Sequence, residues 1–469
     1  MMQSDTAALD DAVSALAMTG DLAMGQPAGH SARVAVLAAR VAAADDAGPD
    51  GVAAARLVAR LRWCGATASA GGFARLLGDD VAGRAAMLAR TLPRPHPLTF
   101  ASVAPLARAQ CEVATCIARM LGLSSTVEEG LRHAFEHADG GGLPAQLAGD
   151  SVPPVVFHVA LAGDLEVLSR AHGLDEAVRR IGRLAGRKYP ADLARRMLPQ
   201  AREWLDAPHD AAPLLAGKAS LALVADVLEL KLPWLAGHAR RVAALARDAA
   251  TLAGLPLEQA RLLERAALVH GLGRAAIPNP VWERNGRLQA PDWHAVRRAP
   301  YWTSQLTSHA PALADAAHLA AHAYERLDGS GYFRRLPAEA LDPAHRLLAA
   351  ATAWAALRAP RPWRAPYDPA AATALLAAQA GRFDRRAVEA VTAAARASRP
   401  AAPRDGGPLT DRELEVLRQV GRGAHPWEAA RALRISTGAV RTHVDSILGK
   451  LECATRPAAM LKALALGLI

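Results

Sequence analysis

The sequence predicts an all-α protein, and three observations support this fold class. Hydrophobic residues make up 51% of the chain and aromatic residues only 4%, so most of the apolar content is Ala, Leu and Val. Ala, Leu and Arg have high helix propensity, whereas strands favour β-branched and aromatic residues. Segments with helical apolar periodicity are separated by Gly, Pro and Asp clusters, and strong hairpin signals are missing.

Four landmarks occur twice in the same order, which indicates an internal repeat. The pairs are AGHSARVAVLAARVA with AGHARRVAALARDAA (from 28 and 236), LRWCGA with LVHGLG (from 61 and 268), HAFEHADGGG with HAYERLDGSG (from 133 and 322), and LAGRKYPADLARRM with QAGRFDRRAVEAV (from 184 and 379). We therefore expect two related helical domains at 1–210 and 215–398. A stretch rich in Pro, Gly and Arg predicts a linker at 399–408, before a third domain at 409–469.

Bulk composition narrows the function classes. The net charge of +10 is compatible with an anionic partner, although much of it is scattered arginine. The four cysteines form no CxxC pair, which argues against a structural zinc site or a disulfide framework. The N-terminus lacks a basic segment followed by an apolar core, and no apolar stretch is long enough to span a bilayer. These features predict a soluble, cytoplasmic protein.

The third domain is predicted to contain four short helices. Thr410 and Glu413 form a capping box at the start of the first helix, which two glycines end. Residues 427–433 form the second helix, and the third begins at Thr437. The apolar, inward-facing side of the third helix comprises Val440, Val444, Ile447 and Leu451. Its outer side presents Thr437, Arg441, Thr442, Asp445 and Lys450, with His443 near the edge.

Two helices joined by a tight turn, with a basic and hydroxylated outer surface on the second, suit the major groove of DNA. Residues 408–469 resemble the DNA-binding helix-turn-helix domain of the LuxR/FixJ class through LTDRELEVL, EAARALRIS, AVRTHVDSILGKL and TRPAAM. The resemblance implies that Val440 and Arg441 face bases. It also implies phosphate or groove-edge contacts from Thr437, Thr442, His443 and Lys450, a scaffold role for Arg412 and Glu413, and a dimer contact by the last helix.

Two departures from the LuxR/FixJ pattern bear on DNA affinity and specificity. His425-Pro426-Trp427 replaces the usual Ser-Asn-Lys and removes a phosphate contact, and Ala439 replaces the usual Thr. Neither change removes the fold or the basic recognition face.

The second copy resembles the HD-GYP phosphohydrolase family over most of 230–395. The residues that carry this resemblance are GHARRVAALA, LVHGLGRAAIPNPVWERNGRLQAPDW, ERLDGSGY, RAPRPWR and AGRFD. In that family a His-Asp pair, further His residues and a later Asp bind two or three metal ions. Those metals activate a water that attacks a phosphodiester, as in cyclic di-GMP. The resemblance thus implies tandem degenerate HD/HD-GYP-like helical domains, followed by a four-helix LuxR-type domain.

Most of the metal-ligand positions differ in this chain. The replacements are Gly271 for the Asp of the pair, Arg274 for the next basic residue, Ala299 for a His before Pro, Ala323-Tyr324 for a His pair, and Thr352 for the later Asp. His238 and His270 remain, but two imidazoles without a carboxylate cannot hold a dinuclear centre. We therefore expect no catalytic residues, no bound metal and no cofactor.

The first copy has fewer of the family residues. Cys64-Gly65 is assigned to the position of the His-Asp pair, which leaves His30, His133 and His137 without an arranged carboxylate partner. Cys64 is expected to be a buried small side chain rather than a sensing thiol. His30 and His238 are expected to be hydrogen-bonded core histidines. The Asp-Gly-x-Gly elements at 139–142 and 328–331 are expected to be turns, with Asp closing the turn and glycine at positive φ.

An emptied metal cleft has the features of a small-ligand pocket, which is concave and mostly apolar with a few polar groups. The candidate pocket residues are Trp234, His238, His270, Glu325, Asp328 and Trp354. The alternative is that these side chains fill the cleft and that the domain only dimerises.

Together, these patterns predict a bacterial transcription regulator that binds double-stranded DNA as a homodimer. The HD-like domains would be an inactive sensory or dimerising body that responds to a small-molecule effector. Two alternatives stay open. One is a residual metal-dependent cyclic-dinucleotide phosphodiesterase that uses His238, His270 and Glu325, and the other is a protein-docking scaffold.

Overall fold

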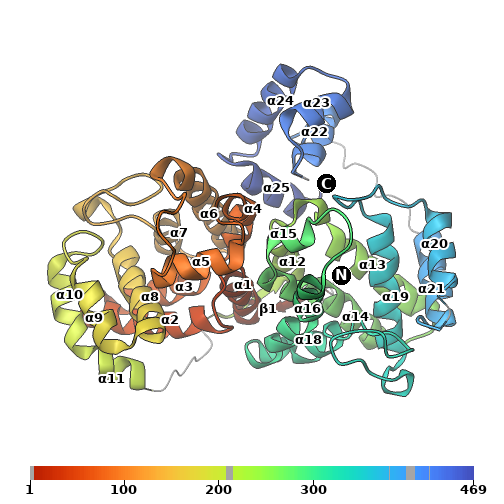
Figure 1. Cartoon of the computed structure of the whole chain (residues 1–469), viewed down its shortest axis with the longest axis horizontal. Coiled ribbons are helices and arrows are strands. Elements are labelled where there is room, and N and C mark those ends of the chain that lie inside the picture. The colour runs from red at the N-terminus through yellow and green to blue at the C-terminus, as the bar shows by residue number, and fades with distance from the viewer. Residues whose placement is uncertain (1–4, 208–214, 380, 398–406, 422) are drawn as a thin grey trace. The chain divides into compact units, whose positions relative to one another are not determined.

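The computed structural model describes residues 5–207, 215–379, 381–397, 407–421 and 423–469. Nearly all of the regular secondary structure in these residues is helical, which confirms the all-α class (Figure 1). They form two compact units, one of Leu16–Ala216 and one that joins Met1–Ala15 to Gly217–Ile469. Residues 399–406 of the predicted linker lie outside the described residues. No helix of the described segments is long and apolar enough to cross a membrane.

The unit Leu16–Ala216 contains a bundle of ten helices, here called the first bundle, which follows helix α1 (Leu9–Ala23). Its helices are α2 (His30–Ala44), α3 (Gly48–Leu61), α4 (Ala66–Leu77), α5 (Asp80–Ala89), α6 (Phe100–Met120), α7 (Ser125–Arg132), α8 (Pro154–His172), α9 (Leu174–Gly182), α10 (Ala191–Met197) and α11 (Ala201–Asp206).

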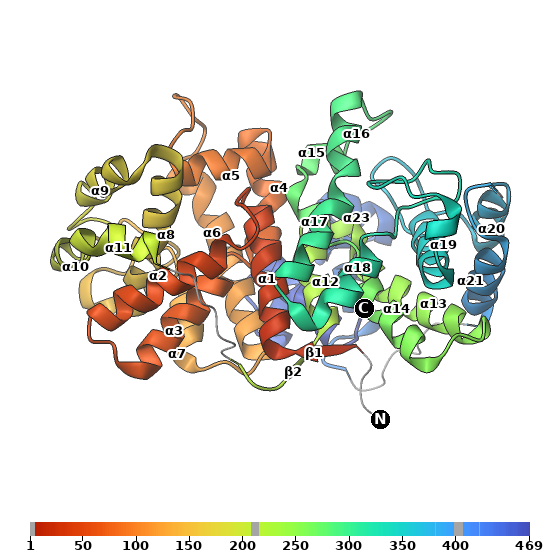
Figure 2. The same cartoon turned by 90° about the horizontal axis from the view of Figure 1, so that it is seen from below.

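The other unit contains a second bundle and a short two-stranded sheet. Strands β1 (Thr6–Ala8) and β2 (Lys218–Ser220) pair antiparallel, with Thr6 opposite Ser220 (Figure 2). The helices of the second bundle are α12 (Leu221–Glu229), α13 (His238–Leu252), α14 (Leu257–Val269), α15 (Asn279–Trp282), α16 (Ala290–Arg297), α17 (Ala299–Ser304), α18 (Ala314–Ala320), α19 (Pro343–Arg358), α20 (Pro369–Ala377) and α21 (Arg385–Ala397).

The C-terminal domain has the four predicted helices, α22 (Asp411–Gly421), α23 (Pro426–Leu433), α24 (Thr437–Lys450) and α25 (Arg456–Ala465) (Figure 1). The predicted capping box is present, because Glu413 accepts a hydrogen bond from the Thr410 amide at 2.7 Å and donates its own amide to the Thr410 hydroxyl at 3.3 Å. Ser436 caps α24 by accepting from the Ala439 amide at 3.1 Å.

The two bundles repeat one arrangement. Helix α2 packs on α3 and α8, just as α13 packs on α14 and α19. Helices α2 and α13 each follow a glycine in the left-handed region, Gly29 with φ 78° and Gly237 with φ 69°. Because the turns require this conformation, glycine is the residue that fits there.

The structure corrects the alignment of the first copy. Helix α3 has its C-cap at Arg62 and α14 at His270. Gly65 lies against the Gln110 carbonyl, and Gly273 lies against the Ala299 carbonyl. The same spacing of 208 residues separates both pairs, as it separates the first residues of α2 and α13. Arg62-Trp63, and not Cys64-Gly65, therefore corresponds to His270-Gly271.

The repeated Asp-Gly-x-Gly elements form the turns that the sequence predicts. Asp139 accepts from the Gly141 amide at 2.9 Å, and Asp328 accepts from the Ser330 amide at the same distance. The intervening glycines have φ of +78° at Gly140 and +71° at Gly329. Both copies of the stretch thus perform the same structural task.

We expect Gly65→Ala to destabilise the first bundle. The added Cβ would lie 2.1 Å from the Gln110 carbonyl oxygen, so helix α6 would have to move. Overpacking of this kind costs about 1–3 kcal/mol. Gly182→Ala is the matched control, because a Cβ there meets nothing within 4 Å and alanine favours the helix. Differential scanning calorimetry measures both variants, and an unchanged unfolding transition for Gly65→Ala would contradict the proposed contact.

Candidate functional site

The centre of the second bundle contains His238, the first residue of α13. Its ring is fully buried, and neither ring nitrogen has a hydrogen-bond partner among the described residues. The expectation of a hydrogen-bonded core histidine was therefore wrong for this residue. Burial, followed by the charges of Arg274, His270 and Arg361, lowers its pKa well below the usual value. The imidazole is neutral at physiological pH.

Glu229, at the end of α12, holds the start of α13. Its carboxylate accepts hydrogen bonds from the amides of His238 at 3.0 Å and Ala239 at 2.6 Å. Backbone amides in the first turn of a helix have no partner within the helix, and the Glu229 carboxylate accepts a hydrogen bond from two of them. Burial raises the pKa of Glu229 to about 7.

His270 uses both ring nitrogens in hydrogen bonds. Its Nδ1 donates to the Ala267 carbonyl at 2.6 Å, and its Nε2 accepts from Arg274 Nη2 at 3.2 Å. The same guanidinium nitrogen donates to the Tyr324 hydroxyl at 2.6 Å. Burial and then Arg274 lower the pKa of His270 to about 3. A guanidinium therefore occupies the lone pair with which this residue would bind a metal.

Three aromatic and basic side chains extend this centre. The Arg361 guanidinium lies over the Trp234 ring, 4.8 Å from its centroid, and Trp363 meets the same ring edge-on at 6.0 Å. Burial and then Arg274 lower the pKa of Arg361 to about 9. The ring N–H groups of Trp234 and Trp354 are buried without a partner among the described residues. Of the predicted pocket residues, the structure thus groups Trp234 with His238 and His270 around arginine side chains.

Glu325 and Asp328 do not contribute free carboxylates to such a pocket. Glu325 accepts hydrogen bonds from the amides of Arg334 at 2.9 Å and Leu336 at 3.2 Å, so both of its oxygens hold the following loop. Asp328 is exposed and closes its own turn. Backbone amides of their own loop use these carboxylates, so their assignment to the ligand pocket has no support from these contacts.

The first bundle has an arginine at the same centre. The Arg62 guanidinium donates to the Val159 carbonyl at 3.2 Å and lies over the Trp63 ring. It also lies against Gly163, where an added Cβ would be 2.3 Å from its nitrogens. Gly163 corresponds to Thr352, since 189 residues separate them, as they separate the starts of α8 and α19. Burial lowers the pKa of Arg62 to about 10, so it remains a cation.

A cavity of about 190 Å³ adjoins this guanidinium in the first bundle. Most of its wall is apolar, with Met24, Trp63, Phe73 and Phe135 among the lining residues. The polar lining residues are Arg62, Gln110, Glu136, His137, Asp164 and Lys188. Sequence reasoning missed Arg62 because the wrong register hid it.

His30 and His133 of the first bundle have carboxylate neighbours, contrary to expectation. His30 Nδ1 lies 2.8 Å from Glu166 Oε2. Burial raises the pKa of Glu166, but His30 and two arginines outweigh it and lower the value to about 2. His133 lies 3.5 Å from Glu129 and 3.9 Å from Glu136. Cys64 is buried, and burial raises its thiol pKa, which agrees with an inert small side chain.

In the C-terminal domain, α24 places the predicted DNA-contacting residues on different sides. Arg441 and Thr442 are exposed, and Thr437 and His443 are half-buried. Val440 is fully buried, so its assignment to a base contact was wrong. It belongs to the apolar face with Val444 and Ile447, because three or four residues separate them along the helix.

Lys450 is only partly available for DNA. Its ammonium lies 2.8 Å from Glu413 Oε2, and the Ser446 hydroxyl donates to the other oxygen of Glu413 at 2.7 Å. Although burial alone would raise it, these partners lower the pKa of Glu413 to about 2. Glu413 thereby ties α22 to α24. Arg412 donates to the Leu433 carbonyl at 2.7 Å, which holds the end of α23 as the scaffold role implies.

Two family models match separate parts of the chain. Residues 222–387 match the family model described as HD domain, and residues 407–463 match the model of bacterial regulatory proteins of the luxR family. A 3'3'-cGAMP-specific phosphodiesterase 3 of Vibrio cholerae is 27% identical over 293 residues, 57% of this chain and 63% of that protein. The transcriptional activator protein SolR of Ralstonia nicotianae is 42% identical over 67 residues, 14% of this chain and 28% of SolR.

The chain thus spans less than two thirds of either relative. The crystal structure of a cyclic GMP-AMP specific phosphodiesterase of V. cholerae, V-cGAP3, has the same fold, with a TM-score of 0.58 and 19% identity. The match covers 84% of this chain and 99% of that one. The chain thus joins a segment that matches HD domains to a C-terminal segment that matches bacterial regulatory proteins of the luxR family.

Proposed function

We propose that this regulator binds DNA as a homodimer, and that its HD-like bundles bind an effector without hydrolysing it. The observation that carries the proposal is a buried guanidinium at or beside the metal-ligand positions of each bundle. Arg62 stands at the position of His270 in the first bundle, and Arg274 is hydrogen-bonded to His270 in the second. The DNA-binding domain supplies the output, and the bundles supply the signal that controls it.

The outer side of α24 supports base recognition by Arg441. This side chain is exposed and stands beside the exposed Thr442. An arginine can donate two hydrogen bonds to a guanine in the major groove. A dimer would place two copies of α24 in successive major grooves, roughly 34–36 Å apart.

The centre of the second bundle opposes phosphodiesterase chemistry. A dinuclear site needs a bridging carboxylate, and Gly271 stands at that position. His270 has no free lone pair, and the charges nearest His238 are arginines, which repel a divalent cation. Without a bound metal, no group here generates a nucleophilic water at neutral pH.

The centre of the second bundle carries arginine side chains and therefore favours an anionic effector. Arg274 and Arg361 lie next to the aromatic rings of Tyr324 and Trp234. Arginine binds phosphate through paired hydrogen bonds, and aromatic rings stack on bases. Trp363, which contacts Trp234, is 46% exposed, so the group is open to solvent on that side. The phosphodiesterase relative acts on 3'3'-cGAMP, and a cyclic dinucleotide is accordingly the proposed effector class.

We expect Arg441→Ala to weaken specific DNA binding by about 1–3 kcal/mol and to relax specificity at one base position. Arg418→Ala is the control, because it removes the same charge from an exposed position on α22. Binding sites are selected from random duplex DNA with the unaltered protein, and both variants are titrated on the selected and scrambled sites. Equal losses for the two variants would contradict a base contact by Arg441.

With Mn²⁺ added, we expect no hydrolysis of cyclic di-GMP or 3'3'-cGAMP above the rate in buffer. The reason is the missing carboxylate at Gly271 and the occupied Nε2 of His270. Chromatography of the nucleotides after incubation measures this directly. Manganese-dependent hydrolysis that His270→Ala abolishes would instead establish the residual phosphodiesterase.

Arg361→Ala is expected to reduce cyclic-dinucleotide affinity at least about tenfold, since one charge-assisted contact is worth roughly 1.5–3 kcal/mol. The matched control is Arg385→Ala, a highly exposed arginine of α21 that pairs with Glu389 in its own helix. Isothermal titration calorimetry with 3'3'-cGAMP and cyclic di-GMP measures both. If neither nucleotide binds the unaltered protein, the effector proposal fails and the docking-scaffold alternative gains support.

A further inference from the structure

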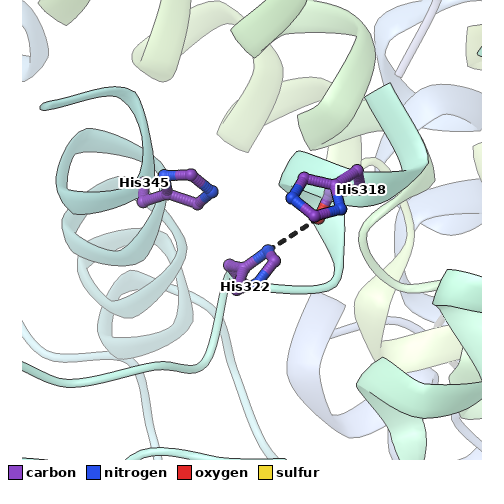
Figure 3. A group of neighbouring side chains, drawn as sticks. All are labelled: His318, His322 and His345. Carbon is purple, nitrogen blue, oxygen red and sulfur yellow. Dashed lines mark hydrogen bonds between the residues drawn. The ribbon is translucent and has the colours of Figure 1, made fainter. Parts of the chain in front are cut away.

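Three histidines meet at one end of α18 and α19, outside the centre described above. His318 lies in α18, His322 follows the end of that helix, and His345 lies in the first turn of α19 (Figure 3). One ring nitrogen from each lies within 4.8 Å of the others. His318 is exposed, His345 is half-buried and His322 is buried, so the cluster is accessible from one side.

Contacts at the Nδ1 atoms orient two of the rings. His322 Nδ1 donates to the His318 carbonyl at 2.7 Å, which leaves the lone pair on its Nε2. Asp342 Oδ1 lies 2.8 Å from His345 Nδ1, close enough for a charge contact but without the alignment of a hydrogen bond. Carbonyl and carboxylate partners of this kind fix the rings of metal-binding histidines and raise their basicity.

Burial favours the neutral form of His318 and His322. Burial, more than the neighbouring His345 and Arg334, lowers the pKa of His322 to about 4. Burial and then Arg334 also lower the pKa of His318, whereas Asp315 and Asp342 act in the opposite direction. Burial thus acts in the direction of the neutral imidazole, which is the form that coordinates a metal ion.

We propose that His318, His322 and His345 bind one divalent transition-metal ion of the zinc type. Imidazole ligands without carboxylates suit Zn²⁺ and its neighbours rather than Mg²⁺ or Ca²⁺. Zinc–nitrogen bonds of about 2.0–2.1 Å bring tetrahedral ligands to roughly 3.4 Å from one another. The rings must therefore approach by a small side-chain rotation, which the exposed His318 permits. Water completes the coordination.

This site differs from the metal centre of the HD-GYP family, whose positions in this chain are occupied by Gly271, Ala299, Tyr324 and Thr352 among others. It is also absent from the first bundle, where Glu129, His133 and Val156 hold the corresponding positions. The ion would join α18 to α19 and so close the loop at 321–342, which carries the repeated stretch.

The test uses the full-length, tag-free protein after removal of metals with a chelator. We expect one equivalent of Co²⁺ to give a visible absorption band and Zn²⁺ to displace it. We expect His318→Ala and His345→Ala to lose at least about tenfold in Zn²⁺ affinity, measured by competition with a chromophoric chelator. His294→Ala is the control, because His294 is exposed on α16 and outside the cluster.

His318 is exposed, so its replacement by alanine leaves no cavity in the core and the test remains interpretable. Circular dichroism checks that the variants are folded, and calorimetry measures whether Zn²⁺ raises the unfolding temperature of the unaltered protein but not of His318→Ala. Unchanged affinity in both cluster variants, the loss of binding in His238→Ala instead, or the absence of tight Zn²⁺ binding would each overturn the proposal.

Discussion

A buried guanidinium in each bundle is the constraint around which the remaining side chains are arranged. Arg62 contacts the Val159 carbonyl and lies against Gly163, where any larger residue would displace it. Arg274 contacts His270 and Tyr324. A cation fixed at the centre opposes a divalent metal by charge repulsion, whereas the phosphohydrolase family collects carboxylates there. The buried cation and the missing carboxylates thus both oppose metal binding at the centre of each bundle.

The stretches HAFEHADGGG (from 133) and HAYERLDGSG (from 322) have a structural role that does not depend on metal chemistry. Glu136 accepts from the amides of Ala145 and Leu147, as Glu325 accepts from the amides of its own following loop. An added Cβ on Gly142 or Gly331 would collide with the backbone beside this glutamate. A carboxylate that satisfies buried amides is costly to remove, because the amides would lose their partners. The stretch therefore keeps its Glu and Gly residues in both copies, although the metal ligands around it differ.

The sequence correctly predicted the features that depend on residues close together in the chain. The capping box at Thr410, the start of α24 at Thr437 and the Asp-closed turns depend on residues within a few positions of one another. It did not predict the pairing of His30 with Glu166, because 136 residues separate them and only the packing of α2 on α8 brings them together. The assignment of Cys64-Gly65 to the His-Asp position was wrong by two residues, because it relied on a few local residues, whereas the helix ends and the close glycines give a spacing of 208 residues.

Tyr324 gives a physical route between the two proposed binding events of the second bundle. It follows His322 by two residues, and its hydroxyl accepts from Arg274 at the cationic centre. An ion at the three histidines would fix the start of this loop and so restrict the position of Tyr324. If that restriction favours effector binding, linkage requires that the effector strengthen metal binding by the same factor. If the ion bound equally well whether or not the loop was restricted, it would leave the effector affinity unchanged, however tightly it bound.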